Sequence, residues 1–204
     1  MKTNTVTWIA TFIILLVLAG LAFHKSTNAS IEYQEGFEVV IEKAEVEEVI
    51  DPDIILLSKY IKTRKSSTPQ EICDIIAYEI ITQCKINHIA DDIVVGIIEI
   101  ESMWNVYATS KAKAKGLMQI LIEDGVEIDT DKAYGIAYNI EKGIAIFKSK
   151  MKKANGDVSL ALKYYVGGDP DYHKAVYKYL GKYTLFKINN SKIEMMKKIK
   201  IEKG

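Results

Sequence analysis

Two glutamates, Glu99 and Glu101, stand two positions apart at the end of an apolar stretch, and this spacing makes them the first candidates for acid–base chemistry. A helix turns successive residues by about 100°, so the two carboxylates point to different faces. Glu101 falls on the arc that holds Ile93 and Ile97, whereas Glu99 falls opposite that arc. We therefore predict that Glu99 is a solvated surface residue with no special role.

Glu101 is the stronger candidate because it points where the isoleucines point. A carboxylate on an apolar face must be paired, protonated or placed at the edge of a cleft, since burying a lone charge costs several kcal/mol. Desolvation raises the pKa of such a carboxyl, which makes it a proton donor near neutral pH. Periodicity alone leaves one alternative open, that the helix ends a turn earlier and Glu101 lies in solvent.

The elements that must position this carboxyl are predicted to be helices. Thr68, Pro69 and Glu71 follow the pattern of a capping box, so the folded domain is expected to begin here. Helices are expected over 69–86, over 91–102, from Asn139 as an N-cap to about residue 154, over 158–165 and over 171–183. Sustained period-two alternation is scarce, so the fold class is predicted to be mainly α.

Both cysteines, Cys73 and Cys84, lie on the first of these helices. Eleven residues at about 1.5 Å rise place them roughly 16 Å apart, which is beyond the reach of a disulfide. They are predicted to be buried thiols. The chain has 3 histidines, none of them at metal-ligand spacing from the cysteines, so we expect no metal site and no cofactor.

Charge balance argues against nucleic acid as a partner. The chain holds 27 Lys and Arg against 27 Asp and Glu, so no overall positive field attracts a polyanion. Arg64 is the single arginine, which leaves bidentate phosphate recognition almost without donors.

The N-terminal residues are apolar enough to meet a membrane. Trp8 to Phe23 is a run of 16 uncharged residues, between the usual length of a signal-peptide core and that of a spanning helix. We interpret residues 1–25 as a signal anchor or a cleaved signal peptide, and a buried helix of a cytosolic protein is a third alternative. Residues 26–66 read as an acidic spacer, 67–186 as the folded domain, and 187–204 as a basic, frayed tail.

Four short motifs resemble a known family. They are "ES" at 101–102, "GLMQI" at 116–120, "NIEKGI" at 139–144 and "ALKYYVGG" at 161–168. Together they resemble the lytic transglycosylase domain of the soluble type, a relative of goose-type lysozyme, over about residues 70–186. The resemblance implies a lysozyme-like helical domain, here preceded by the N-terminal apolar helix. It also implies an enzyme that cuts peptidoglycan glycan strands between N-acetylmuramic acid and N-acetylglucosamine.

The resemblance assigns roles to five residues. Glu101 matches the catalytic acid, and Tyr165 matches a tyrosine that helps to position it. Ser102, Met118 and Gln119 match substrate-binding positions. Three departures weaken the match: Lys113 stands where the family usually has Gly, Val166 where it has Asn, and Gly167 where it has Ala.

A single carboxylate suffices if the sugar supplies its own nucleophile. The resemblance implies a lyase in which Glu101 acts first as acid and then as base, leaving a 1,6-anhydro ring. Two alternatives stay open. One is a lysozyme-type hydrolase that uses one of the acids between residues 123 and 131, which otherwise read as a solvated loop. The other is a non-catalytic, membrane-tethered glycan-binding scaffold.

The expected location is the cell envelope, where peptidoglycan lies. The protein would be anchored by the N-terminal helix facing the periplasm or the exterior, or exported after signal cleavage. Its partners are then peptidoglycan strands, the membrane and envelope machinery. Whether it remodels its own cell's wall, serves a secretion machine or serves a phage is left open.

Overall fold

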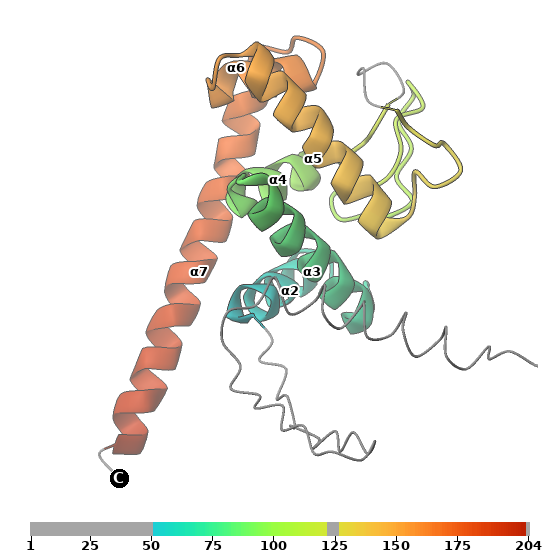
Figure 1. Cartoon of the computed structure of the whole chain (residues 1–204). Helices are drawn as coiled ribbons and strands as arrows, with labels where there is room; N and C mark the ends of the chain where they lie inside the picture. The colour runs from blue at the N-terminus through green and yellow to red at the C-terminus, as the bar shows by residue number, and fades with distance from the viewer. Residues whose placement is uncertain (1–50, 122–126, 203–204) are drawn as a thin grey trace, which may run out of the picture. The chain divides into compact units, whose positions relative to one another are not determined.

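The structure is a computed structural model and describes residues 51–121 and 127–202. It contains α2 (Pro52–Arg64), α3 (Gln70–Asn87), α4 (Asp91–Glu101), α5 (Ile136–Lys153), α6 (Val158–Tyr165) and α7 (Tyr172–Glu202) (Figure 1). Two isolated antiparallel bridges join Lys115 to Thr109 and to Ile120, and these ranges hold no strand. The prediction of a mainly α fold is confirmed for them. The N-terminal apolar helix falls outside the described residues.

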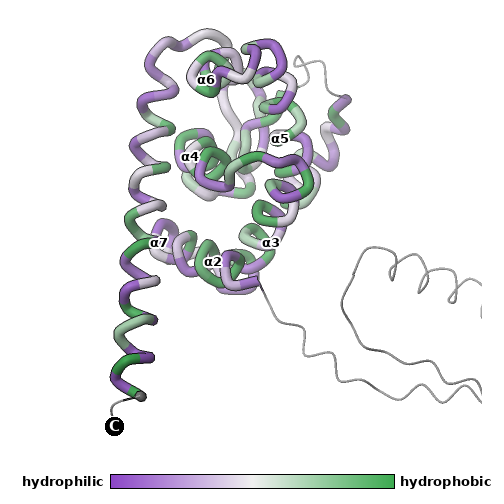
Figure 2. The backbone as a smooth tube through the Cα atoms, turned by 60° about the vertical axis from the view of Figure 1, so that its left-hand side comes forward, coloured by the Kyte–Doolittle hydropathy of each residue, from purple (hydrophilic) through white to green (hydrophobic). Residues whose placement is uncertain are grey.

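Helix α4 carries the candidate carboxyl and lies among the other helices (Figures 1 and 2). It contacts α3 and, most extensively, α7. Six consecutive residues, 94–99, are buried, so α4 is covered on more than one face. The predicted bounds of 91–102 agree with the structure to within one residue.

Helix α2 belongs to the folded unit, which corrects the predicted spacer for residues 51–66, while residues 26–50 fall outside the described residues. Leu57, Tyr60 and Ile61 are at most 3% exposed and join the main hydrophobic core. The helix packs on α3 and also contacts α7. The acidic residues around it obscured this apolar stripe, because its partners lie far away in the sequence. The folded part therefore begins before Thr68.

Two predicted helix starts are also wrong in detail. The N-cap of α3 is Pro69, and no side chain caps this helix, so the capping box at Thr68 does not form. Helix α5 begins at Ile136, three residues before Asn139. The Asn139 side chain is buried and bonds to a distant loop, as described below. In both places a favourable local capping pattern gave way to tertiary packing.

Helix α7 continues to Glu202, far beyond the predicted end at residue 183. Its first half packs on α4, and its second half projects past α2 (Figures 1 and 2). The basic tail predicted to fray from residue 187 is therefore helical as far as Glu202.

The two cysteines are free and buried, as predicted. Burial raises the pKa of the Cys84 thiol to about 12, so it stays protonated. Among the described helices, none combines the length and apolarity that crossing a bilayer requires.

Candidate active site

Glu101 is the last residue of α4, and its carboxyl accepts a hydrogen bond from a tyrosine of α7. The Tyr172 hydroxyl donates to Glu101 Oε1 at 2.5 Å. Burial raises the pKa of the Glu101 carboxyl above its usual value, while the Tyr172 hydrogen bond lowers it in part. The Tyr172 side chain is only 5% exposed, and burial raises its own pKa strongly, so the phenol stays protonated as a donor. Glu101 is thus a partly buried carboxyl with one fixed partner.

Close packing of α4 on α7 brings these two side chains together. A Cβ atom added at Gly96 would lie 2.8 Å from both Val176 Cγ1 and Val176 O, so only glycine permits this approach. At the other end of α4, Thr184 Oγ1 donates to Asp92 Oδ2 at 3.1 Å. Lys187 adds ion pairs to the acids at the start of α4. The helices run antiparallel, which sets the first residue of α7 against the last of α4.

The chain reverses immediately after the candidate carboxyl. Ser102 caps α4, and its buried hydroxyl donates to Ile98 O at 3.2 Å. Met103 and Trp104 then adopt φ values of 48° and 63°, a left-handed conformation that is rare for bulky residues. The reversal buries Trp104 to 1% exposure, with its ring centroid 6.4 Å from that of Tyr60. Trp104 therefore belongs to the core and anchors the end of α4.

Asn139 holds the "GLMQI" loop in place through three hydrogen bonds to the backbone. Its Oδ1 accepts from Met118 N at 2.8 Å, and its Nδ2 donates to Lys115 O at 2.9 Å and to Ala133 O at 2.7 Å. The Asn139 side chain is 1% exposed. The buried polar groups of its amide and of the loop backbone are therefore hydrogen-bonded to each other instead of to water. The sequence indicated Asn139 because it begins "NIEKGI", but the role predicted for it was that of a helix N-cap.

The loop residues predicted to bind substrate occupy different environments. The Met118 side chain is fully buried, and a Cβ at Gly143 would lie 2.4 Å from its sulfur. Gln119 is partly exposed with φ of 49°, and its Nε2 donates to Ala108 O and Gly116 O. Tyr165 donates its hydroxyl proton to Met118 O at 2.8 Å. Substrate contact by Ser102, Met118 and Gln119 stays a prediction. The backbone of Met118 is the part that joins the hydrogen-bond network.

Tyr172 is the partner of Glu101 that periodicity did not reveal. It lies on a tyrosine stripe of α7 with Tyr183, which is the usual pattern of a core-facing surface. The expected positioning residue was Tyr165, whose hydroxyl reaches the loop and which contributes to the raised pKa of Tyr172. Tyr165 thus acts on Tyr172, and Tyr172 in turn contacts Glu101.

Glu99 contradicts the prediction of a solvated residue. It is 2% exposed, and its Oε1 accepts from Arg64 Nε at 2.7 Å and from the Tyr60 hydroxyl at 3.1 Å. A second bond joins Arg64 to Oε2 at 3.3 Å. The face of α4 opposite the isoleucines is also covered, by α2 and α7. The assumption that only the isoleucine face of this helix is buried was therefore wrong. The single arginine of the chain neutralises this carboxylate.

An aromatic pair with one exposed and one half-buried ring follows the candidate carboxyl in sequence. Tyr107 is 77% exposed, and its ring centroid lies 6.2 Å from that of Tyr134. The Tyr134 hydroxyl bonds to Thr109 at 2.6 Å, and Lys115 Nζ lies 5.3 Å from the ring centroid.

Lys113, one of the three departures from the resemblance, lies in an unusual backbone conformation. Its φ is 68°, a left-handed conformation that disfavours side chains with a Cβ. Val166, which replaces the usual Asn, caps α6 and is 37% exposed. The first departure strains the backbone, and the second removes an amide from the surface.

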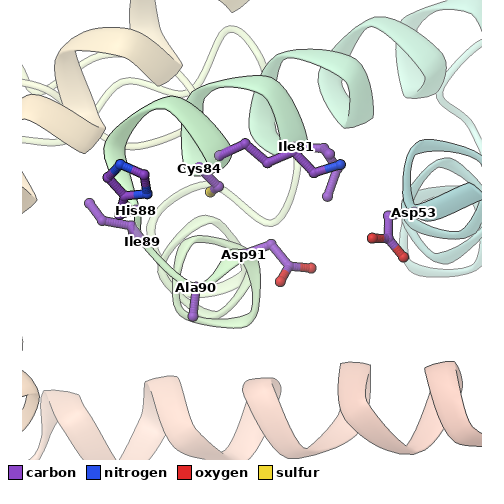
Figure 3. A pocket seen from close by; sticks show the side chains of 8 residues that line it. Asp53, Ile81, Cys84, His88, Ile89, Ala90 and Asp91 are labelled. Atoms are coloured by element: carbon purple, nitrogen blue, oxygen red, sulfur yellow. The ribbon is translucent and has the colours of Figure 1, made fainter. Parts of the chain in front are cut away.

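One pocket of about 340 Å³, shown in Figure 3, does not have Glu101 among its lining residues. Asp53, Cys84, His88 and Asp91 are among its lining residues. Asp91 begins α4 and Glu101 ends it, about 15 Å along the helix. The pocket has no part in the chemistry at Glu101. Within residues 51–121 and 127–202, no group of three or more acidic, His or Cys side chains is arranged to hold a metal.

This helical domain places a carboxyl with a raised pKa at a helix end, beside a tyrosine hydroxyl donor. The family model described as the transglycosylase SLT domain matches residues 78–183, just over half of the chain. The chain therefore belongs to this family, and its domain is a lytic transglycosylase domain. Neither the curated proteins nor the solved structures include a match to it.

Proposed function

We propose that the protein cleaves the bond between N-acetylmuramic acid and N-acetylglucosamine in peptidoglycan, with Glu101 as the single acid–base group. Family membership supports lytic transglycosylase activity in general. The observation that carries the assignment to Glu101 is its raised pKa, caused by burial, together with the hydrogen bond from Tyr172. A protonated carboxyl near neutral pH is what departure of the glycosidic oxygen requires.

In the first step, Glu101 donates its proton to the glycosidic oxygen as the bond to the anomeric carbon breaks. The 2-acetamido carbonyl oxygen of the muramic sugar forms a new bond to that carbon, so no second enzymic carboxylate is needed. Tyr172 then stabilises the carboxylate that remains on Glu101.

In the second step, the ionised Glu101 takes the proton of the muramic 6-hydroxyl. The hydroxyl oxygen displaces the acetamido oxygen at the anomeric carbon and closes a 1,6-anhydro ring. Glu101 ends protonated, as it began, and no water is consumed. A hydrolase would instead need a group to activate water. Of the acids predicted for that role, Glu127, Asp129 and Asp131 are exposed, and Asp129 pairs with Lys132 at 3.1 Å.

Digestion of purified sacculi followed by mass spectrometry tests the proposal. The wild type should release muropeptides with 1,6-anhydro ends, and Glu101→Gln should lose about 100-fold or more of the activity. The exposed residue Glu127 supplies the matched control, Glu127→Gln, which should keep full activity. Reducing ends would assign a hydrolase. A wild type that releases nothing while still binding sacculi would assign a scaffold.

We also propose that the protein acts in the cell envelope, since its substrate lies there. The predicted anchor at residues 1–25 falls outside the described residues and stays a prediction. Fractionation tests it: an anchored protein pellets with membranes and resists salt extraction, whereas a cleaved one is released. The same experiment on intact cells shows whether the domain faces outward.

A further inference from the structure

The second half of α7 carries an apolar stripe that no described residue covers. Its members are between 44% and 67% exposed, and they recur along about 21 Å of helix. They are Leu185, Ile188, Ile193, Met195, Met196 and Ile199. Figure 2 shows hydrophobic and hydrophilic positions interleaved along this projecting segment.

The stripe points away from the folded unit. The polar residues Asn190, Ser191 and Glu194 line a hollow of about 280 Å³ shared with the start of α2. Lys59 of α2 acts electrostatically on Glu194, which confirms that this side of α7 faces α2. At about 100° per residue, Met196 lies on the opposite side of the helix from Glu194. The helix therefore turns its polar side inward and its main apolar stripe outward.

This orientation is the reverse of that of an ordinary surface helix. A globular protein gains stability when the apolar face covers the core, so an outward stripe indicates a further partner. The segment from Lys187 to Glu202 also holds five lysines against two glutamates, a net charge of +3. The partner must accept isoleucine and methionine side chains and, alongside them, positive charge.

We propose that this half of α7 lies on the surface of an anionic lipid bilayer. Lys192 and Lys200 fall within the apolar arc of the helix, and both are exposed. A protein partner covering the stripe would have to desolvate these ammonium groups, which is costly without paired carboxylates. At a bilayer surface the lysine stems lie along the acyl boundary and the charges reach lipid phosphates. A second copy of the helix would set like charges against each other.

A fluorescent dye attached to the full chain, at one position in each labelled protein, tests the proposal. Both native cysteines are buried, so a cysteine introduced by Met196→Cys is the accessible one for an environment-sensitive dye. The matched control, Ser191→Cys, puts the dye on the side that faces α2. Because each labelled protein keeps residues 1–25, membrane attachment through that segment affects both dyes equally.

With vesicles that contain phosphatidylglycerol, a quencher carried on the lipid tails should reduce the Met196→Cys dye emission about twofold or more. The Ser191→Cys dye should change little. Pure phosphatidylcholine vesicles should give much less quenching, because each lysine near an anionic surface contributes to binding. Lys192→Glu with Lys200→Glu should lower the quenching, whereas Lys178→Glu, on the first half of α7, should not.

Three results would overturn the proposal. Equal quenching of both dyes means that α7 does not turn its apolar stripe toward the bilayer. Equal quenching in zwitterionic vesicles removes the electrostatic argument. A blue shift of the Met196→Cys dye that grows with protein concentration and needs no lipid assigns the stripe to a protein partner. Release of anhydro-muropeptides from sacculi is measured in parallel, so failure of the proposed catalytic function is distinguished from failure here.

Discussion

Glu99 and Glu101 lie two residues apart on α4, yet Glu99 is paired with a cation, whereas burial raises the pKa of Glu101. Glu99 is bound by Arg64 at 2.7 Å, and the pKa of that guanidinium is raised by the same hydrogen bond. Glu101 meets no cation in the described contacts, only the Tyr172 hydroxyl at 2.5 Å. The difference comes from the elements that face each residue, α2 in one case and α7 in the other.

The Arg64 and Glu99 pair should be essential for stability. Glu99 is 2% exposed in the structure, and Arg64→Ala removes its cation. We therefore expect a loss of about 2 to 4 kcal/mol in the free energy of unfolding. The value lies below that of a fully buried pair because the Arg64 side chain is 34% exposed. Urea denaturation measures it. Lys111→Ala, at an exposed position, is the control, and equal midpoints for the two variants would contradict the pairing.

Glu99→Gln therefore should not be silent, contrary to the expectation for a surface residue. The amide keeps the shape but weakens the bidentate contact with Arg64 and leaves the guanidinium poorly compensated. We expect about 1 to 3 kcal/mol of destabilisation, with chemistry retained in the folded fraction. Activity per folded molecule, measured below the melting temperature, separates this variant from Glu101→Gln.

Glu101 itself should reduce stability at neutral pH. A carboxyl whose folded pKa is raised stabilises the fold fully below its unfolded pKa, near 4.5, and loses that contribution as pH rises through the folded value. Glu101→Gln carries no charge at any pH. Its melting temperature should therefore exceed that of the wild type at pH 7, and the difference should vanish below about pH 4.5. A constant difference across pH would show that burial of this charge is not the cause.

Tyr172 should influence the pH profile as well as the rate. Its hydrogen bond lowers the pKa of Glu101, so Tyr172→Phe removes that effect while keeping the ring that buries the carboxyl. The alkaline limb of activity, where Glu101 loses its proton, should move to higher pH. The rate at the optimum should fall about 10-fold to 100-fold, because the carboxylate formed in the first step loses a donor. Tyr177→Phe, more exposed on the same helix, should leave the limb in place.

The local parts of this site were predictable from the sequence, and the long-range parts were not. Apolar periodicity placed α4 and its end to within one residue of Glu101, because both depend on neighbours within a few turns. The environment of Glu99 depends on Arg64, 35 residues earlier, and that of Glu101 on Tyr172, 71 residues later. Contacts between side chains so far apart in the sequence leave no periodic pattern in it, so only the structure shows them.

Gly96 should control the distance between Glu101 and Tyr172. A methyl group there would meet Val176 at 2.8 Å, including backbone that cannot move alone, so Gly96→Ala should push α7 away from α4. We expect about 1 to 3 kcal/mol of destabilisation and a lower kcat. Gly181→Ala is the matched control, since nothing lies within 4 Å of its added Cβ. Ala in this helix should instead stabilise by about 0.5 to 1 kcal/mol.

Asn139 should control the loop that carries Met118 and Gln119. Asn139→Ala leaves Met118 N, Lys115 O and Ala133 O without their partner in a place that water does not reach easily. Each unsatisfied buried group costs about 1 to 3 kcal/mol, so the loop should rearrange rather than stay in place. We expect KM for glycan strands to rise and protease cleavage within 115–120 to appear, even where the helices remain folded. Asn189→Ala, exposed on α7, should change neither measurement. An Asn139→Ala protein with unchanged KM and an uncut loop would show that the loop holds its shape without this amide.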